Sequence, residues 1–330
     1  MGRWRALSRR DRRDPPVNAA RIALVLFVLP VALRAQAPAP APIERQPPST
    51  IYVESRLVSV ALNVVDEHGA PVGGLTQADF ELSEDNRPQK IAVFDKESST
   101  PLEIVLAIDA SESVFADDRL ERDAAKSFVK SLLRPQDRLD LMDFADNVDE
   151  LVSFTNDPHR IDDGLGRIQR GEATALYDAV YLAAQRLGQA SAAPGARKVM
   201  VLITDGENTT HHGSYNDAIE EAERAGAMVY ALIIVPVEAD AGRNTGGEHA
   251  LIQMSRDTGG KFYYVADKHD LGPAFQHVSD DLRTQYTVGY YAPQRGVDLS
   301  GLRHIHLKLK DPALRAKYTL RYRMAYYGNR

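Results

Sequence analysis

The sequence predicts an α/β protein: a doubly wound, mostly parallel sheet with helices on both faces, plus a small β-sandwich-like domain formed by the flanking segments. Three observations predict this architecture. Apolar runs alternate with amphipathic helical patterns through the middle of the chain, whereas both flanks show only strand patterns. The chain of 330 residues is also longer than one minimal domain requires.

The first 35 residues are typical of a secretory signal peptide. Eight Arg against two Asp give this segment a net charge of +6, and an apolar run follows at 22–33, interrupted by Pro30, before the small residues Ala35 and Ala37. Twelve residues are too few to cross a bilayer, which takes about 20. We therefore expect an exported protein that is periplasmic, in the cell envelope or secreted. An uncleaved N-terminal anchor is the alternative, and the only membrane contact expected.

Composition excludes several classes of function. The chain has no cysteine, which rules out disulfides, thiol catalysis and cysteine-ligated zinc. The total charge is −6, so the part of the chain after residue 35 carries −12. An acidic body argues against nucleic-acid binding, because phosphate neutralisation needs a basic face. Residues 36–50 are rich in Pro and Ala and predict an extended linker.

A β-rich segment is expected at 51–98. Apolar and small or polar residues alternate over 58–64, as in a strand with one buried face. The stretch 67–71, Glu-His-Gly-Ala-Pro, is a turn signal, and 80–83 and 91–94 predict two more strands.

The α/β domain is expected at 99–283. Its first strand, 104–108, is continuously apolar, as in a parallel strand buried on both faces. A helix is predicted at 119–133 from apolar residues spaced four apart, and a hairpin from 138–144 and 150–154. Further elements alternate as helix 175–187, strand 198–204, helix 216–225, strand 228–234, helix 250–257, strand 262–265 and helix 271–282.

The last segment, 284–330, again predicts strands. It holds seven of the 14 Tyr residues, and period-2 alternation marks 305–309 and 318–322. Each flank is too small to be stable alone. We therefore expect 284–330 to pack with 51–98 in one β domain, with the α/β domain inserted between the two halves. The tyrosines are expected in its core and edges.

Three polar stretches follow predicted strands or precede a predicted helix. Asp109-Ala-Ser111-Glu-Ser113 follows the first buried strand, Thr174 precedes the second helix, and Asp205 lies in Thr-Asp-Gly at the end of the strand 198–204. Ligands of open α/β sheets bind outside the carboxyl ends of the strands, where the connection direction reverses. If the two strands are neighbours, Asp109 and Asp205 converge there.

The chemistry of this set is that of hard oxygen donors. Carboxylates and hydroxyls select Mg²⁺, Ca²⁺ or Mn²⁺ over zinc or copper. Two carboxylates about balance the charge of a divalent ion, and neutral hydroxyls add none. Such an ion can accept one more anionic oxygen from outside the chain.

Together, D-x-S-x-S, the distant Thr and T-D-G resemble the metal-ion-dependent adhesion site (MIDAS) of von Willebrand factor type A (VWA) domains over Pro101–Arg283. The whole chain is similar to a bacterial, largely acidobacterial, group of VWA-related proteins. The resemblance implies a Rossmann-like sheet with an antiparallel edge strand at 150–154. It implies a non-enzymatic adhesion protein without catalytic residues or organic cofactor. It also implies a protein partner whose Asp or Glu completes the coordination of a metal bound by Asp109, Ser111, Ser113, Thr174 and Asp205.

One departure and two alternatives stay open. Glu112 stands where the family commonly has a small residue, and it could occupy the open coordination position or repel an acidic ligand. The protein could be a structural subunit of an envelope assembly, with the metal only bracing loops. It could also be a magnesium-dependent, phosphatase-like hydrolase, although that chemistry usually needs a second Asp at position 111, which is Ser.

Other polar clusters are expected to lie on the protein surface and not to form a metal site. The pairs His211-His212 and His304-x-His306 lack an evident third ligand, so exposed histidines are expected. A solvated acidic surface is expected from Asp146, Asp149, Asp157, Asp162 and Asp163.

Overall fold

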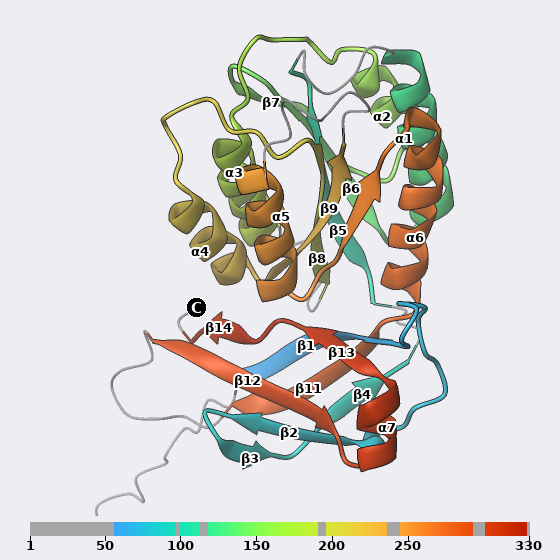
Figure 1. Cartoon of the computed structure of the whole chain (residues 1–330), viewed down its shortest axis with the longest axis vertical. Helices are drawn as coiled ribbons and strands as arrows, with labels where there is room; N and C mark the ends of the chain where they lie inside the picture. Colours follow the sequence, from blue (N-terminus) through green and yellow to red (C-terminus); the bar gives the residue numbers. More distant parts are fainter. Residues whose placement is uncertain are drawn as a thin grey trace, which may run out of the picture. The chain divides into compact units, whose positions relative to one another are not determined.

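The structure, a computed structural model, describes residues 56–96, 100–111, 118–190, 196–235, 245–292 and 301–328. The predicted signal peptide (1–35) and linker (36–50) lie outside the described residues, as do Glu112 and Ser113. The predicted fold class is confirmed, because a mostly parallel sheet covered by helices is accompanied by strands from both flanks (Figure 1). Among the described residues, no helix is both long and apolar enough to cross a membrane.

The larger sheet is formed in the order β10-β9-β8-β5-β6-β7. All neighbouring strands are parallel except β6 and β7, which form the predicted antiparallel hairpin at one edge. Strands β5 and β9 are buried along their whole length, as continuously apolar sequences require. The strands are β5 (Leu102–Asp109), β6 (Arg138–Phe144), β7 (Val148–Thr155), β8 (Arg197–Thr204), β9 (Ala227–Ile234) and β10 (Phe262–Val265).

Two hydrophobic clusters cover the two faces of this sheet. One includes apolar residues of α1, α2 and α6, and the other includes those of α3, α4 and α5, so the domain has three layers (Figure 1). The helices are α1 (Asp118–Leu132), α2 (Pro158–Leu165), α3 (Leu176–Gln189), α4 (Tyr215–Ala225), α5 (Thr245–Asp257) and α6 (Leu271–Arg283), with a 3₁₀ turn at Lys268–Asp270.

The flanking strands form two four-stranded sheets that enclose a third hydrophobic cluster. One sheet has the order β13-β1-β11-β4, and β1 pairs antiparallel with β11 and β13 from the other end of the chain. The second sheet has the order β14-β12-β2-β3. These elements are β1 (Arg56–Val65), β2 (Phe80–Glu84), β3 (Arg87–Gln89), β4 (Val93–Asp95), β11 (Tyr286–Ala292), β12 (Leu302–Leu309), β13 (Thr319–Tyr322) and β14 (Ala325–Tyr327), with α7 (Pro312–Lys317) and a 3₁₀ turn at Gln77–Asp79.

The structure adds short elements that the sequence patterns did not predict. Helices α2 and α7 both begin after an Asp whose side chain accepts a backbone N–H, Asp157 and Asp311, followed by proline. Strands β2 and β3 form a tight hairpin in which Asp85 and Asn86 have φ angles of 44° and 64°. Asn and Asp tolerate this left-handed conformation better than other non-glycine residues.

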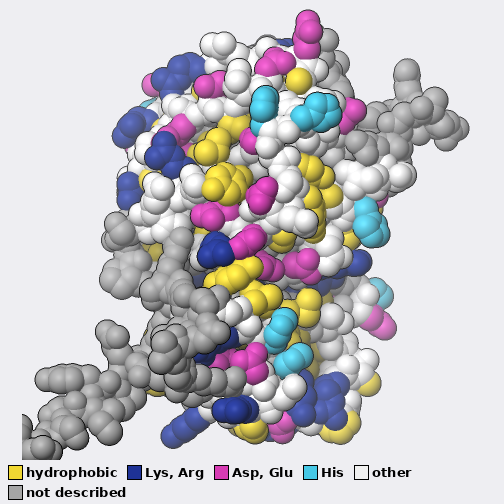
Figure 2. Space-filling model, turned by 90° about the vertical axis from the view of Figure 1, so that its left-hand side faces the viewer, with side chains coloured by type: hydrophobic (Ala, Val, Ile, Leu, Met, Phe, Trp, Pro, Cys, Tyr) yellow, Lys and Arg dark blue, Asp and Glu magenta, His cyan; other side chains and the backbone are white. Residues whose placement is uncertain are grey.

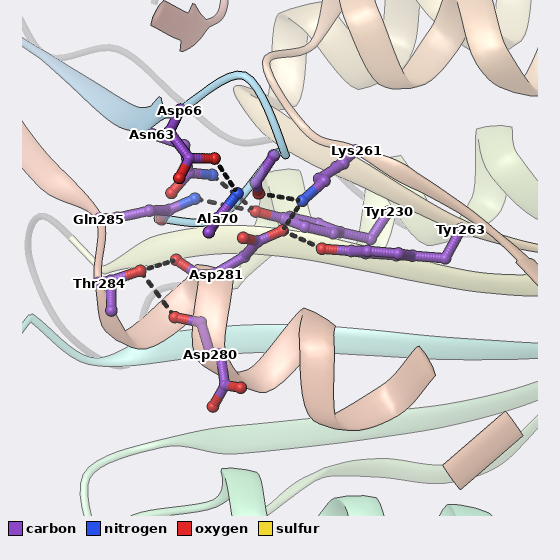
Figure 3. Close-up of polar contacts among 11 residues, drawn as sticks. Asn63, Asp66, Ala70, Tyr230, Lys261, Tyr263, Asp280, Asp281, Thr284 and Gln285 are labelled. Carbon is purple, nitrogen blue, oxygen red and sulfur yellow. Dashed lines mark hydrogen bonds and ion pairs between the residues drawn. The ribbon is translucent and has the colours of Figure 1, made fainter. Parts of the chain in front are cut away.

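Buried polar contacts connect the α/β domain to the β domain (Figure 3). The hydroxyl of Tyr230 on β9 accepts hydrogen bonds from Asn63 of β1 and Gln285, both at 3.0 Å. The ammonium of Lys261 contacts Asp281 at 3.4 Å and donates to the carbonyl of Gly69, a turn residue of the β domain, at 3.2 Å. Lys261 precedes β10 and Tyr230 lies in the middle of β9, so these contacts do not involve the residues that end β5 and β8.

Candidate metal centre

The candidate site lies where two parallel strands end side by side. Pairing of Ile108 with Ile203 places Asp109, the last residue of β5, beside Thr204, the last residue of β8. The hydroxyl of Thr204 donates a hydrogen bond to Oδ2 of Asp109 at 2.6 Å. The chain passes from β5 to β6 on one side and later returns to β8 on the other, so this is a topological switch point.

Asp109 is a buried acid held in one orientation. Its side chain is 2% exposed, and its second oxygen, Oδ1, accepts the backbone N–H of Ser111 at 3.0 Å. Burial raises the pKa of Asp109 to about 6, and the charge of Asp205 adds to the increase, whereas hydrogen bonds from Ser111 and Thr204 oppose it. Asp205 is the next residue after Thr204, whose hydroxyl contacts Asp109, so the two acids end neighbouring strands, as the strand order predicts.

A second loop, which carries Thr174, is attached to the Asp109 loop. The N–H of Gly171 donates to the carbonyl of Ala110 at 3.2 Å, and Gly171 forms an isolated parallel bridge with Ser111. The N–H of Ala175 donates to the carbonyl of Ala145, at the end of β6, at 2.9 Å. Thr174 is 2% exposed between these two attachments.

Asp146 holds the same loop from the β6–β7 turn. Its carboxylate accepts the N–H groups of Glu172 and Ala173, both at 3.2 Å. This approach requires glycine at position 171, because a Cβ there would lie 2.3 Å from Oδ2 of Asp146 and 2.7 Å from Cβ of Ala145. Asp146 is exposed as expected, but its hydrogen bonds to this loop have no signal in the sequence pattern.

The third loop begins with Asp205 and meets the second. The N–H of Thr209 donates to the carbonyl of Thr174 at 3.0 Å, and the N–H of Thr174 donates to the hydroxyl of Thr209 at 2.8 Å. Oδ1 of Asp205 accepts the N–H of Glu207 at 2.9 Å, which forms a local turn. Hydrogen bonds therefore connect all three predicted stretches.

Hydrogen bonds thus connect the loops that carry four of the five predicted residues, Asp109, Ser111, Thr174 and Asp205, while Ser113 lies outside the described residues. Three supporting residues, Thr204, Thr209 and Asp146, were not predicted as part of the site. The position of Thr204 in the Thr-Asp-Gly motif is a usable signal, because a polar side chain at a buried strand end needs a partner. Thr209 has no comparable signal in the sequence.

The donor set fits a hard divalent cation. Carboxylate and hydroxyl oxygens are ligands that Mg²⁺, Ca²⁺ and Mn²⁺ prefer. Asp109 is almost fully buried and lies near a second acid, an arrangement that costs free energy unless a cation balances the charge. Asp109 and Asp205 together supply the two negative charges that one such ion needs.

Other histidines and acids do not form a second centre in the described part of the chain. His211 and His212 are exposed, and so are His304 and His306, which share one face of β12. Within the described ranges, no group of three or more His, Asp or Glu side chains is arranged to hold a metal. On the face drawn in Figure 2, Lys and Arg lie interspersed with Asp and Glu.

A doubly wound α/β domain with oxygen donors at its switch point defines a class of ligand-binding domains. Within this class, the sequence profile of the von Willebrand factor type A domain matches residues 103–277, and the chain belongs to this family. VWA domains are generally interaction modules without catalytic activity. No protein with a curated description matches the chain.

Several solved structures resemble parts of this chain at low sequence identity. BatB from Bacteroides thetaiotaomicron is 22% identical over 56% of this chain and 100% of its own, with a TM-score of 0.44. A von Willebrand factor type A protein from Catenulispora acidiphila is 12% identical over 81% and 72%, with a TM-score of 0.48. Proximal thread matrix protein 1 from the mussel byssus, in a form with a zinc-occupied MIDAS motif, is 17% identical over 62% and 50%, with a TM-score of 0.48.

Proposed function

We propose that this protein is a metal-dependent protein–protein interaction module, exported to the periplasm, cell envelope or extracellular space. One divalent cation, Mg²⁺, Ca²⁺ or Mn²⁺, is held by Asp109, Ser111, Ser113, Thr174 and Asp205. A carboxylate of a protein partner completes its coordination. The observation that carries this proposal is the meeting of the Asp109, Thr174 and Asp205 loops at one switch point.

Charge explains why such a site would capture an acidic group. Two carboxylates neutralise the formal charge of the ion, and the hydroxyl donors leave that balance unchanged, so the metal retains affinity for an added anionic oxygen. The signal-like segment at 1–35 supports export.

A non-enzymatic role is favoured over phosphoryl transfer by the residue at position 111. Hydrolases that use an aspartate nucleophile beside Mg²⁺ usually need a second Asp two residues further along the chain. Here that position, two residues after Asp109, holds Ser.

Metal binding is tested by thermal unfolding and calorimetry with Mg²⁺ and Mn²⁺. A ligand that binds only the native state stabilises it by about 2.7 kcal/mol at one hundred times its Kd. We expect metal to raise the Tm of the wild type, EDTA to reverse the increase, and Asp109→Asn to remove it. A metal-dependent increase that persists in Asp109→Asn would place the ion elsewhere.

Ligand capture is tested with a random peptide display library. Peptides selected on the Mg²⁺-loaded protein and released by EDTA should contain an Asp or Glu whose amide variant no longer binds. Selection of peptides that stay bound in EDTA, or that bind equally well as amide variants, would contradict carboxylate coordination. If the protein is instead a structural subunit whose metal only braces loops, peptide binding should persist in EDTA.

A further inference from the structure

We infer that Thr204 is a positioning residue of the metal centre, which aims the carboxylate of Asp109 at the ion. This inference rests on the proposed function, and it assigns a role to a residue outside the predicted ligand set. The side chain of Thr204 is 0% exposed and lies at the end of β8, next to Asp109 on the neighbouring strand.

The direction of the Thr204 hydroxyl is fixed by two hydrogen bonds. A hydroxyl has one proton to donate and two lone pairs to accept with. Its oxygen accepts the N–H of Gly206 at 3.0 Å, and its proton is donated to Oδ2 of Asp109 at 2.6 Å. Because the single proton is engaged, the hydroxyl cannot turn elsewhere without breaking its bond to Asp109.

The turn that supplies the Gly206 N–H is itself constrained. Gly206 has a φ of 87°, a conformation that favours glycine. A Cβ at this position would lie 2.8 Å from the backbone carbon of Gly247 in α5. The close packing of this turn on α5 holds the donor that orients Thr204.

The consequence for Asp109 is a carboxylate restrained at both oxygens. Ser111 restrains Oδ1 through its backbone N–H, and Thr204 restrains Oδ2 through its side chain. Ser111 also hydrogen-bonds Asp109 through its side chain, but its backbone N–H remains after any substitution at 111, and its hydroxyl belongs to a proposed ligand. Thr204 is therefore the position where the orientation of Asp109 can be changed without replacing a proposed ligand.

Groups that hold metal ligands in place commonly change metal affinity by 10–100-fold when they are replaced. Thr204→Val keeps the shape of the side chain and removes the hydroxyl, so Oδ2 of Asp109 loses its donor. Thr204→Ser keeps the hydroxyl. We expect the Val variant to bind Mg²⁺ and Mn²⁺ at least tenfold more weakly, and the Ser variant to stay within about threefold of the wild type.

Thr258 offers a matched control. Its side chain is 2% exposed, its hydroxyl accepts the N–H of Val229 at 2.9 Å, and it donates to the carbonyl of Met254 at 2.8 Å. This threonine thus has the same hydrogen-bonding pattern as Thr204, in the same domain, but it lies near the amino end of β9. Thr258→Val should destabilise the fold and leave metal affinity unchanged.

The experiment is calorimetric titration of the full chain and the three variants with Mg²⁺ and Mn²⁺, alongside Tm values in EDTA. The inference is supported if metal affinity falls at least tenfold in Thr204→Val, is retained in Thr204→Ser and does not change in Thr258→Val. Equal affinity of Thr204→Val and wild type overturns it, and so does an equal loss in the Ser variant. If Thr204→Val does not fold, Thr204→Ala takes its place. A wild type that binds neither metal overturns the proposed function as well.

Discussion

A buried carboxyl group on β6 should make the stability of this protein fall as pH rises. Asp140 is fully buried, and its neighbours two and four residues along the strand, Met142 and Phe144, belong to the cluster under α3, α4 and α5. Burial raises the pKa of Asp140 from about 4 to about 7, although the charge of Arg186 opposes the increase. The folded protein therefore holds this proton more tightly than the unfolded chain does.

The sign of the effect follows from that difference. Between pH 4 and pH 7 Asp140 is ionised in the unfolded chain but still protonated in the folded protein, so a rise in pH favours unfolding. The loss of folding free energy is complete above pH 7, where Asp140 is ionised in both states. Replacing Asp140 by Asn removes this contribution. From pH 5 to pH 8, the free energy of unfolding of the wild type should fall relative to that of Asp140→Asn by about 2 kcal/mol.

Urea denaturation of both proteins at pH 5, 6, 7 and 8, in EDTA, measures this change. Asp109, whose pKa is also raised by burial, is present in both proteins, so its contribution cancels in the difference. Parallel stability curves for the two proteins would contradict the assignment of the titration to Asp140.

At the scale of elements, the long helices and strands follow from their sequence patterns, while the short ones depend on single residues. The continuously apolar β5 and the four-residue spacing of α1 predict these elements to within a few residues. Helices α2 and α7 have only 8 and 6 residues, too few for a periodic pattern. Their usable signal was Asp-Pro, at 157–158 and 311–312, where the Asp caps the helix and the Pro occupies the first turn.

Only the part of the site that lies at the ends of strands could be predicted from the sequence. Asp109 and Asp205 each follow the apolar residues of neighbouring parallel strands, so their convergence follows from topology. The loop of Thr174 is different, because the β6–β7 turn holds it through Asp146, 28 residues earlier in the chain. No periodicity connects two loops that are so far apart in sequence.

Gly171 should be the position most sensitive to substitution in this loop. In Gly171→Ala, Asp146 can turn away from the new methyl group, but the Cβ of Ala145, 2.7 Å away, is fixed to the backbone just after β6 and cannot rotate away. We expect a loss of stability of about 1–3 kcal/mol and weaker Mg²⁺ binding, because the loop that carries Thr174 must shift.

Gly272→Ala is the control for this element-scale prediction. A Cβ at Gly272, in the first turn of α6, would have no heavy atom within 4 Å. This variant should gain about 0.5–1 kcal/mol, since alanine loses less backbone entropy than glycine on folding. Calorimetric titration and denaturation of both variants measure the two effects. Wild-type Mg²⁺ affinity in Gly171→Ala would show that this loop does not contribute to the site.

For the whole molecule, the β domain is assembled from both flanks of the α/β domain. Strand β1 lies between β11 and β13, which follow it by more than 200 residues. Strand patterns predict the strands themselves, but the polar contacts between the two domains could not be predicted. Asn63, Tyr230 and Gln285 are common residue types without a motif, and only the folded chain brings them together.

These contacts should couple the stabilities of the two domains. Asn63, Tyr230 and Gln285 are almost completely buried, with exposed fractions of 3%, 0% and 0%. Tyr230→Phe removes the hydroxyl oxygen that accepts hydrogen bonds from the side-chain amides of Asn63 and Gln285. Both buried donors then lose this acceptor. An unsatisfied buried donor costs about 1–3 kcal/mol, so we expect Tyr230→Phe to lower the free energy of unfolding by about 2 kcal/mol or more.

A double-mutant cycle separates coupling across the domains from simple loss of stability. Asn63→Ala should cost less in the Tyr230→Phe background than in the wild type, with a coupling free energy of about 1 kcal/mol, because the amide has already lost its partner. Tyr290→Phe is the matched control: this tyrosine is also fully buried, but its hydroxyl donates to Glu84, inside the β domain, at 2.7 Å. Asn63→Ala and Tyr290→Phe should be additive within about 0.5 kcal/mol. Additivity in the Tyr230 cycle as well would mean that this hydrogen bond does not link the two domains energetically.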